Sequence, residues 1–277
     1  MGHGGGVRPP LLAAALAGLT ALLALAPAAR ASTPALVAPS ALPLAGRTIA
    51  IDPGHQLTET AHPQAINRKV WVGFWKVCNT SGTATNGGYP EATFTWATSL
   101  ALKADLEVLG ARVRLTRSSN SHLDPSPCID ARGRFGAKVG ADLEISLHGD
   151  GAASQVHGFF VIKPGLRRGY TDDILRTSNA LALSVRSGLS GAGFPVSSSY
   201  GGDGLDVRRD LGTLNMADVP TVMVELGNMR NAGDARCMTS PRCRGRYAQG
   251  LADGVRSYLA RPAQPNRLAG STTTKGS

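Results

Sequence analysis

Residues 48–55 have the sequence Thr-Ile-Ala-Ile-Asp-Pro-Gly-His. The first half predicts a short buried strand, and the Asp-Pro-Gly that follows predicts a turn. His55 therefore stands just beyond the end of a predicted strand. Two further apolar runs have the same form, because the run at 142–147 precedes His148 and the run at 221–224 precedes Glu225.

Strands and helices are expected to alternate along the chain. Further strands are predicted at 111–116 and 158–162, and helices at 91–109, 129–139, 172–189 and up to residue 258. This order favours right-handed strand-helix-strand units. The predicted fold is a single α/β domain with a mostly parallel, twisted sheet and helices on both faces.

The polar residues at the strand ends predict a metal site. Carboxyl ends of parallel strands share one edge of a sheet, so we expect His55, His148 and Glu225 to converge there. Glu91 opens a helix behind Pro90, where the helix dipole favours the ionised carboxylate and makes it a ready metal ligand. Two imidazoles and one carboxylate bind Zn²⁺ and leave a fourth position for water. A second carboxylate beside that position serves as a base, and the whole arrangement is suited to amide hydrolysis.

Each of these residues also has a structural interpretation. A histidine at a strand end is often only hydrogen bonded, a glutamate in the first turn of a helix often only caps it, and Glu225 could pair with an arginine. His62 and His157 are rival ligands, ranked lower because the first lies in an irregular stretch and the second begins a strand. His122 is expected to face solvent. The sequence signatures of common zinc peptidases, α/β-hydrolases and P-loop enzymes do not occur in the chain.

The two ends of the chain are predicted to lie outside the folded domain. Arg8, a charge-free apolar run and a small-residue site at 29–31 predict a secretory signal peptide at residues 1–31. A retained membrane anchor is the alternative, because the apolar stretch at 11–29 approaches the roughly 20 residues of a spanning helix. We expect residues 32–46 to form a linker rich in Pro and Ala, residues 47–260 the folded domain, and residues 261–277 a disordered tail.

Charge and cysteine content fit an exported protein. The formal net charge of +10 falls to +8 when Arg8 and Arg30 leave with the signal segment, and this charge favours anionic polymers as partners. Nucleic acid is not expected, because the chain has no recognition motif and only 5% aromatic residues. Four cysteines in an exported chain predict disulfides.

Three pairings of the four cysteines are possible. Cys237 and Cys243 are close in sequence, which favours a local bridge and leaves Cys78 to pair with Cys128. That second bridge would tie down residues 56–89, which are rich in Gly and are expected to form one long loop. The loop either forms a wall of the binding groove or is a surface loop with a stabilising disulfide.

Four motifs, taken in order, resemble the zinc-dependent N-acetylmuramoyl-L-alanine amidases. They are the strand with Asp52-Pro53-Gly54-His55, Pro90-Glu91 at a helix start, Ser146-Leu147-His148, and Val224-Glu225-Leu226-Gly227-Asn228. The resemblance covers residues 47–260. Exported members with a single catalytic domain are similar in a further respect, since they have a stretch like 79–83 and a cysteine in each of two loops.

The resemblance implies that His55, Glu91 and His148 hold zinc and that Glu225 is the catalytic carboxylate. It also implies hydrolysis of the amide between the lactyl group of N-acetylmuramic acid and the L-alanine of peptidoglycan. The expected protein is a secreted cell-wall hydrolase, a monomer, with no membrane span after signal cleavage. Departures from the family pattern occur at Glu144, Leu147 and 149–150, and none of them is an implied ligand.

Two other functions remain open at this point. One is a non-catalytic peptidoglycan-binding module on an amidase fold, and the other is a different zinc peptidase, such as a carboxypeptidase that acts on cell-wall peptides. The chemical position of the cleaved bond distinguishes them.

Overall fold

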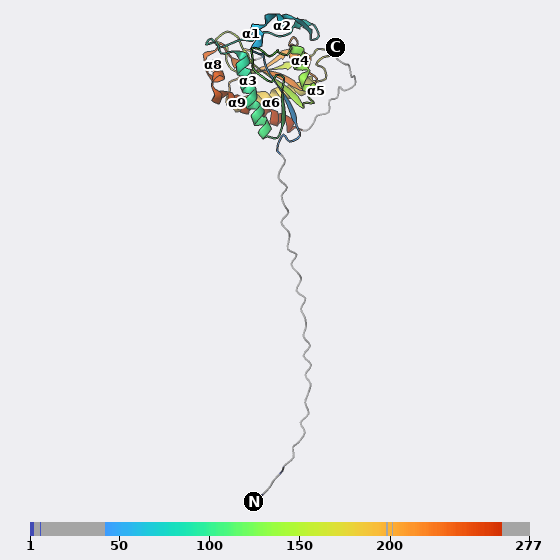
Figure 1. Ribbon diagram of the computed structural model, residues 1–277, viewed down its shortest axis with the longest axis vertical. Coiled ribbons are helices and arrows are strands. Elements are labelled where there is room, and N and C mark those ends of the chain that lie inside the picture. Colours follow the sequence, from blue (N-terminus) through green and yellow to red (C-terminus); the bar gives the residue numbers. More distant parts are fainter. Residues whose placement is uncertain (3–5, 7–41, 198, 201, 262–277) are drawn as a thin grey trace. The chain divides into compact units, whose positions relative to one another are not determined.

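A six-stranded sheet lies at the centre of the part of the chain that the computed structural model describes, which is residues 1–2, 6, 42–197, 199–200 and 202–261 (Figure 1). Most of the expected signal segment 1–31, residues 32–41 of the expected linker and residues 262–277 of the expected tail lie outside the described residues. Among the described helices, none combines the length and hydropathy that crossing a bilayer requires.

The sheet has the strand order β4-β1-β5-β8-β6-β7. The first four strands run parallel, β6 is antiparallel to β8, and β7 is parallel to β6. The prediction of a mostly parallel α/β sheet is therefore confirmed. In sheet order the strands are β4 (Arg112–Leu115), β1 (Thr48–Pro53), β5 (Leu143–Asp150), β8 (Thr221–Asn228), β6 (Phe160–Pro164) and β7 (Leu205–Arg208).

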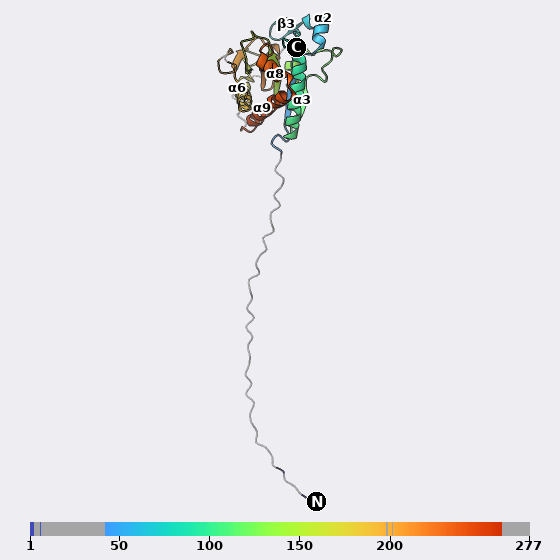
Figure 2. The same cartoon turned by 90° about the vertical axis from the view of Figure 1, so that its left-hand side faces the viewer.

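Helices cover both faces of the sheet. Three long helices pack on one another and on one face (Figure 2): α3 (Glu91–Val108), α6 (Leu175–Gly191) and α9 (Pro241–Leu259), with α8 (Ala232–Thr239) leading into α9. Three short helices adjoin the other face: α4 (Ile129–Gly133), α5 (Phe135–Lys138) and α7 (Gly212–Asn215). The predicted 129–139 helix is thus divided, with Arg134 between its two parts.

The alternation of side chains along β5 assigns the two faces. Leu143, Ile145 and Leu147 belong to the apolar core under the long helices. Glu144, Ser146 and His148 point to the opposite face, because successive side chains of a strand alternate. The polar residues of this strand therefore lie on the side of the short helices, where the candidate site is found.

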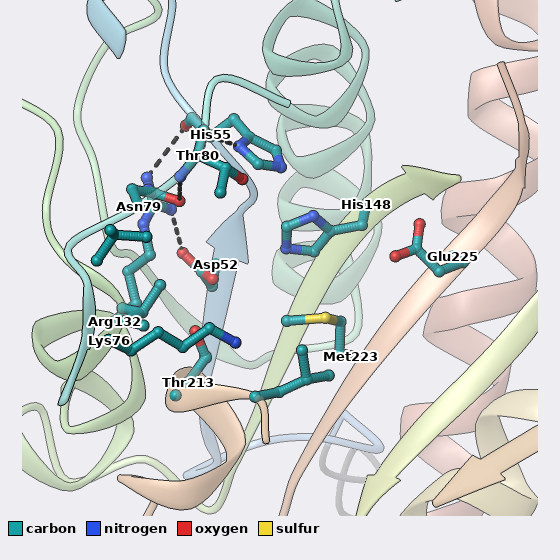
Figure 3. A pocket seen from close by; sticks show the side chains of 14 residues that line it. Asp52, His55, Lys76, Asn79, Thr80, Arg132, His148, Thr213, Met223 and Glu225 are labelled. Carbon is teal, nitrogen blue, oxygen red and sulfur yellow. Dashed lines mark hydrogen bonds and ion pairs between the residues drawn. The ribbon is translucent and has the colours of Figure 1, made fainter. Parts of the chain in front are cut away.

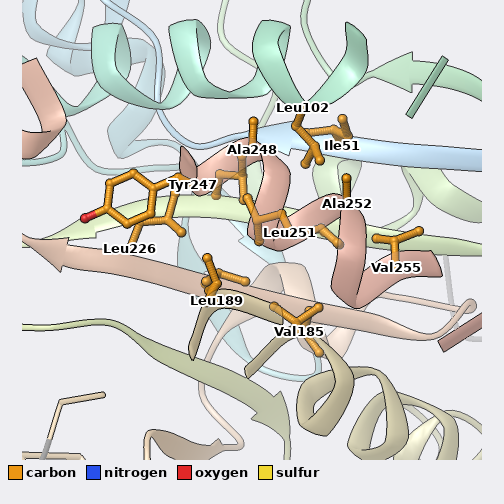
Figure 4. Packing of buried hydrophobic residues seen from close by; sticks show 14 of the residues in the cluster. Ile51, Leu102, Val185, Leu189, Leu226, Tyr247, Ala248, Leu251, Ala252 and Val255 are labelled. Atoms are coloured by element: carbon orange, nitrogen blue, oxygen red, sulfur yellow. The ribbon is translucent and has the colours of Figure 1, made fainter. Parts of the chain in front are cut away.

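The core is closed by α9. Tyr247, Leu251 and Val255 recur at a spacing of four along this helix and are almost fully buried. Figure 4 shows them between the sheet, α3 and α6. Ser240 begins the helix, since its side chain accepts a hydrogen bond from the Cys243 amide, and proline follows it at the first helical position.

Residues 56–89 are not one irregular loop. They contain α1 (Thr58–Ala61), α2 (Pro63–Asn67) and an antiparallel hairpin of β2 (Lys69–Trp71) and β3 (Trp75–Val77). The elements are short and lack a clear period, so the sequence pattern did not indicate them. Tertiary contacts hold them, among them the Cys78–Cys128 disulfide, and both predicted disulfides are present.

Other element boundaries also differ from the sequence-based expectation. Strands β5 and β8 continue beyond residues 147 and 224, so His148 and Glu225 lie inside strands rather than just after them. Strand β7 and helices α7 and α8 were not predicted. Residues 42–46, at the end of the expected linker, include a turn in which Leu44 is buried and its amide donates to the Leu109 carbonyl at 2.8 Å.

Candidate metal centre

Three side chains that could hold a metal ion meet at the carboxyl edge of the parallel strands. One ligand atom from each of His55, Glu91 and His148 lies within 4.8 Å of the others. His55 Nε2 is 3.4 Å from Glu91 Oε2, and His148 Nδ1 is 3.0 Å from Glu91 Oε1. Zinc bonds of about 2 Å in tetrahedral directions place neighbouring ligand atoms about 3.3 Å apart. The three donors are therefore close enough together to hold a single metal ion.

His55 is placed by an unusual backbone conformation at the end of β1. Its φ angle is 60°, which non-glycine residues rarely adopt and which a fold retains mainly at functional positions. Gly54 is needed just before it, because a Cβ at this position would overlap with the His148 ring. At Gly82, which has a φ of +74°, a Cβ would lie only 2.9 Å from Glu91 Oε2. The backbone thus passes close to His148 at Gly54 and close to Glu91 at Gly82.

Hydrogen bonds fix the ring of His55. Its Nδ1 lies 2.7 Å from the Thr80 carbonyl oxygen and 3.2 Å from Glu59 Oε2. A carbonyl only accepts hydrogen bonds, so Nδ1 carries a proton, and Nε2 is the ring nitrogen that faces Glu91 and is left to bind a metal ion. Glu59 is buried and is itself held by Asn79 Nδ2 at 2.6 Å and by the Ser126 hydroxyl. Supporting bonds of this kind are typical of metal-binding histidines.

Glu91 is the first residue of α3 and is held by backbone amides. The Thr83 amide donates to its Oε2 at 2.9 Å, and the Gly149 amide donates to its Oε1 at 3.1 Å. Burial alone favours the neutral acid, but His55 and His148 offset this and hold the pKa of Glu91 well below its usual range. Burial disfavours the charged form of His55 and lowers its pKa, but the carboxylates of Glu91 and Glu59 more than offset this and raise the pKa well above 6.5.

Glu225 faces the donor cluster from the neighbouring strand. It lies opposite His148 in the register of β5 and β8, and Figure 3 shows its carboxylate on the side that faces His148. Among the described residues, its Oε2 has no hydrogen-bond partner although it is buried. Burial and the carboxylates of Glu91 and Asp150 raise the pKa of Glu225 well above 4.5. This carboxyl group is therefore able both to take up and to release a proton.

A buried ion pair supports the turn that carries His55. Arg132, from α4, donates to Asp52 Oδ1 at 2.5 Å and to the backbone carbonyl of His55 at 3.1 Å. Thr116 and Ser146 also donate to the Asp52 carboxylate, at 2.6 and 2.7 Å. Burial disfavours the charge of Asp52, but Arg132 and the two hydroxyls lower its pKa overall.

A pocket of about 210 Å³ opens over this centre. Figure 3 shows the Lys76 side chain reaching into it below Asp52. The Lys76 ammonium group is half-buried and donates to the Asp210 carbonyl at 2.6 Å. Three groups of residues line the pocket: the centre and its supports (Asp52, His55, Arg132, His148, Glu225), the 76–80 segment (Lys76, Val77, Asn79, Thr80), and apolar or small residues (Ile129, Leu211, Gly212, Thr213, Met223).

Comparison with known proteins shows the family. The N-acetylmuramoyl-L-alanine amidase family matches residues 49–257. The chain belongs to this family. It is 39% identical over 243 residues to an N-acetylmuramoyl-L-alanine amidase of Mycobacterium tuberculosis, a match that covers 84% of this chain and 96% of the relative.

Solved structures of mycobacterial amidases share the fold. The apo form of the N-acetylmuramyl-L-alanine amidase of Mycobacterium abscessus superimposes with a TM-score of 0.73 at 40% identity, covering 78% of this chain and 100% of the other. The enzyme of Mycobacterium smegmatis gives a TM-score of 0.72 at 34% identity, covering 78% and 98% of the two chains. The protein is thus an amidase of this family.

In the amidase, the rival histidines lie outside the cluster of possible metal ligands. His62, His122 and His157 are exposed, and in the described part of the chain His55, Glu91 and His148 form the one group of this type. Of the two interpretations of residues 56–89, the lining of the pocket by the 76–80 segment favours the one in which they form a wall of the groove.

Sequence reasoning missed several residues that support the site of the amidase. Glu59 stands four residues after His55, a spacing at which two side chains meet on one turn of helix, and this was the available signal. Arg132 had no local signal, because its partner Asp52 lies 80 residues away along the chain. Lys76 likewise reaches the pocket through a hairpin that was not predicted.

Glu144, one of the departures from the family pattern, is a fully buried carboxyl group beneath the site. The Gly136 amide donates to its Oε2 at 2.8 Å, while its Oε1 has no partner among the described residues. Burial raises the pKa of Glu144 well above 4.5, and the nearby Asp52 carboxylate raises it further. The amidase therefore favours the neutral acid at this position.

Proposed function

We propose that the chain is a zinc-dependent amidase that cuts the bond between the lactyl group of N-acetylmuramic acid and L-alanine. The observation that carries the proposal is the convergence of His55, Glu91 and His148 with the Glu225 carboxylate facing them. A donor set of two histidines and one glutamate is one that zinc uses in catalytic sites.

His55, Glu91 and His148 would hold the ion, His55 through Nε2 because its Nδ1 donates to Thr80. When bound, zinc polarises the amide carbonyl and makes water acidic enough to supply hydroxide near neutral pH. The backbone amides that donate to Glu91, together with Glu59 and Thr80 beside His55, keep these donors oriented before substrate arrives.

Glu225 is proposed to move the proton. Its carboxylate accepts a proton from the attacking water as the new C–O bond forms, and it then donates this proton to the leaving nitrogen of L-alanine as the C–N bond breaks. A raised pKa suits both steps, since the group must be a base first and an acid afterwards. The products are a free lactyl carboxylate on the glycan and a peptide with a free amino terminus.

We also propose that residues 1–31 are a signal peptide, that residues 261–277 are a tail beyond the catalytic domain at 47–260, and that the enzyme acts outside the cytoplasm as a monomer. The order of charged, apolar and small residues at the N-terminus supports export. Two disulfides also support it, because such bonds persist in oxidising compartments.

The test combines metal content with product identification, using residues 32–277 and purified sacculi. Wild-type protein should retain one zinc ion per chain and release peptides that begin with a free L-alanine. His148→Ala should lose both the metal and the activity. His62→Ala is the matched control, since His62 is exposed and outside the cluster, and it should keep both.

The same experiment separates the alternatives. New amino termini inside the stem peptide would identify a different zinc peptidase. Binding to sacculi without any released product would identify a non-catalytic module. Either result would refute the proposed reaction.

A further inference from the structure

The hairpin next to the pocket presents an exposed pair of tryptophans. Trp71 and Trp75 are directly opposite each other in the β2–β3 register, so both side chains project from one face of the hairpin. Trp71 is 40% exposed and Trp75 is 67% exposed, and their rings lie edge to face with centroids 5.5 Å apart. The sequence contains three tryptophans, so this short hairpin holds two of them.

The tip of the hairpin is fixed to the body of the protein. The Trp71 indole N–H donates to the Tyr170 hydroxyl at 2.8 Å. The Arg167 guanidinium group lies over the Phe74 ring, 4.8 Å from its centroid, and donates to the carbonyl of Gly73. These contacts hold the indole rings in position without burying them.

The base of the hairpin is fixed as well. The disulfide from Cys78 to Cys128 anchors the end of β3 to the start of α4. Large exposed apolar side chains on a rigid support are typical of binding surfaces, because ordering them costs little entropy when a ligand arrives. Packing in the hydrophobic core does not explain the presence of a tryptophan at position 75, because this residue is exposed.

The wall of the active-site pocket includes the end of β3, where Lys76 from one face of the strand and Val77 from the other both line the pocket. Val77 projects from the same face of β3 as Trp75, about 7 Å further along the strand, because side chains two residues apart share a face. Val77 lines the pocket that contains His55, His148 and Glu225. A ligand that occupies the pocket and extends along this wall would therefore reach Trp75.

We propose that the Trp71–Trp75 face binds the glycan strand of peptidoglycan, with the pyranose ring next to the muramic acid stacked on the Trp75 indole. This inference rests on the proposed function, in which the cut amide is linked through the lactyl group to a sugar of that strand. When the amide that is cut lies next to Glu225, the sugars of the attached glycan strand must lie at the rim of the pocket. A pyranose ring has an apolar C–H face that matches an indole ring, and a rim of hydroxyl groups that match polar side chains.

The first test measures binding without turnover. Mature protein carrying Glu225→Ala is titrated with peptide-free glycan oligosaccharides, and the same titration is repeated after adding Trp75→Ala. We expect about tenfold weaker binding for Trp75→Ala, the loss typical of an aromatic side chain at the centre of a contact. Trp75→Tyr should restore most of the affinity, because it keeps an aromatic face.

Val108→Ala is the matched control. Val108 is 75% exposed and ends α3, an 18-residue helix that begins at Glu91, so it lies about 26 Å along the helix from Glu91. This variant should bind the oligosaccharides as well as its parent does. Thermal unfolding of each variant confirms that Trp75→Ala is folded.

The second test measures specificity in protein that retains Glu225. On long glycan strands, Trp75→Ala should lower kcat/KM about tenfold relative to its value on a muropeptide with a single sugar, mainly through a higher KM. Equal losses on both substrates would overturn the proposal. So would unchanged oligosaccharide binding, a loss shared with Val108→Ala, or a Trp75 effect confined to self-association or to binding of lipid vesicles.

The outcomes also separate this inference from the proposed reaction. If wild-type protein released no L-alanine peptide from any substrate, the proposed function would fail, while the oligosaccharide titration would still decide whether Trp75 binds glycan. If wild-type protein cleaved sacculi and Trp75→Ala matched it on long strands, the amidase assignment would stand and the glycan surface would be refuted.

Discussion

The Cys78–Cys128 disulfide joins two segments that hold His55 in place. Thr80, two residues after Cys78, accepts the hydrogen bond from the His55 ring. Arg132, four residues after Cys128, donates to the His55 backbone carbonyl. We therefore predict that removing this bridge lowers both the stability of the fold and its affinity for zinc.

The size of the stability loss follows from the length of the closed loop. This bridge has a sequence separation of 50, for which the chain-entropy relation gives about 4 kcal/mol. The Cys237–Cys243 bridge has a separation of 6, which corresponds to about 2 kcal/mol. For a domain of this size, each kcal/mol shifts the melting temperature by about 2–4 °C, so the expected drops are about 8–16 °C and about 4–8 °C.

The assay compares two double variants, Cys78→Ala with Cys128→Ala and Cys237→Ala with Cys243→Ala. Melting temperature and urea unfolding report stability, and competition with a chelator reports zinc affinity. We expect the first pair to bind zinc at least about tenfold more weakly, as when a group that supports a metal-binding histidine is lost. The second pair is the control and should bind zinc normally. Equal stability losses, or normal zinc affinity in the first pair, would refute the reasoning.

Three further predictions concern single carboxyl groups. Glu225→Gln should retain zinc but lower kcat on peptidoglycan by about 10²–10⁴-fold, and wild-type turnover would remove Glu225 from the mechanism. Glu59→Gln should weaken zinc binding about 10–100-fold, because it removes the charge beside His55. The control variant Glu107→Gln, at a partly exposed position, should bind zinc normally. Chelator titration measures the zinc affinity of each variant, and equal affinities would contradict the role of Glu59 in holding His55. Glu144 has its folded-state pKa raised above 4.5, so its contribution to stability is fully present below about pH 4.5 and is lost as the pH rises. Urea unfolding should therefore show wild type losing stability relative to Glu144→Gln between pH 4.5 and 8, and a constant difference would show that Glu144 does not titrate differently on folding.

The strands and the long helices could be predicted because their sequence patterns are local. The apolar run before His55 and the helix behind Pro90 have the expected forms in the structure. The ends of β5 and β8 could not be predicted in the same way. Both strands continue through glycine and polar residues that would ordinarily end a strand, since pairing between them, up to Asp150 opposite Asn228, supplies the hydrogen bonds.

The remaining features depend on contacts between distant segments. The hairpin at 69–77 has short strands that would not be stable alone, and it needs the Cys78 bridge and Arg167 to hold it. The carboxylate of Glu59 and the guanidinium group of Arg132 reach the site only once the chain has folded. Sequence alone therefore indicated the candidate donors, and the structure adds the groups that orient them.

The alignment of His148 with Glu225 across two hydrogen-bonded strands has an evolutionary consequence. A one-residue insertion ahead of either residue would turn that residue's side chain toward the opposite face and separate it from its partner, because successive side chains of a strand alternate. The connections that border the pocket carry no such constraint and can lengthen, shorten or exchange residues. The preference for differently modified cell walls can therefore change through these connections, while His148 and Glu225 keep their positions.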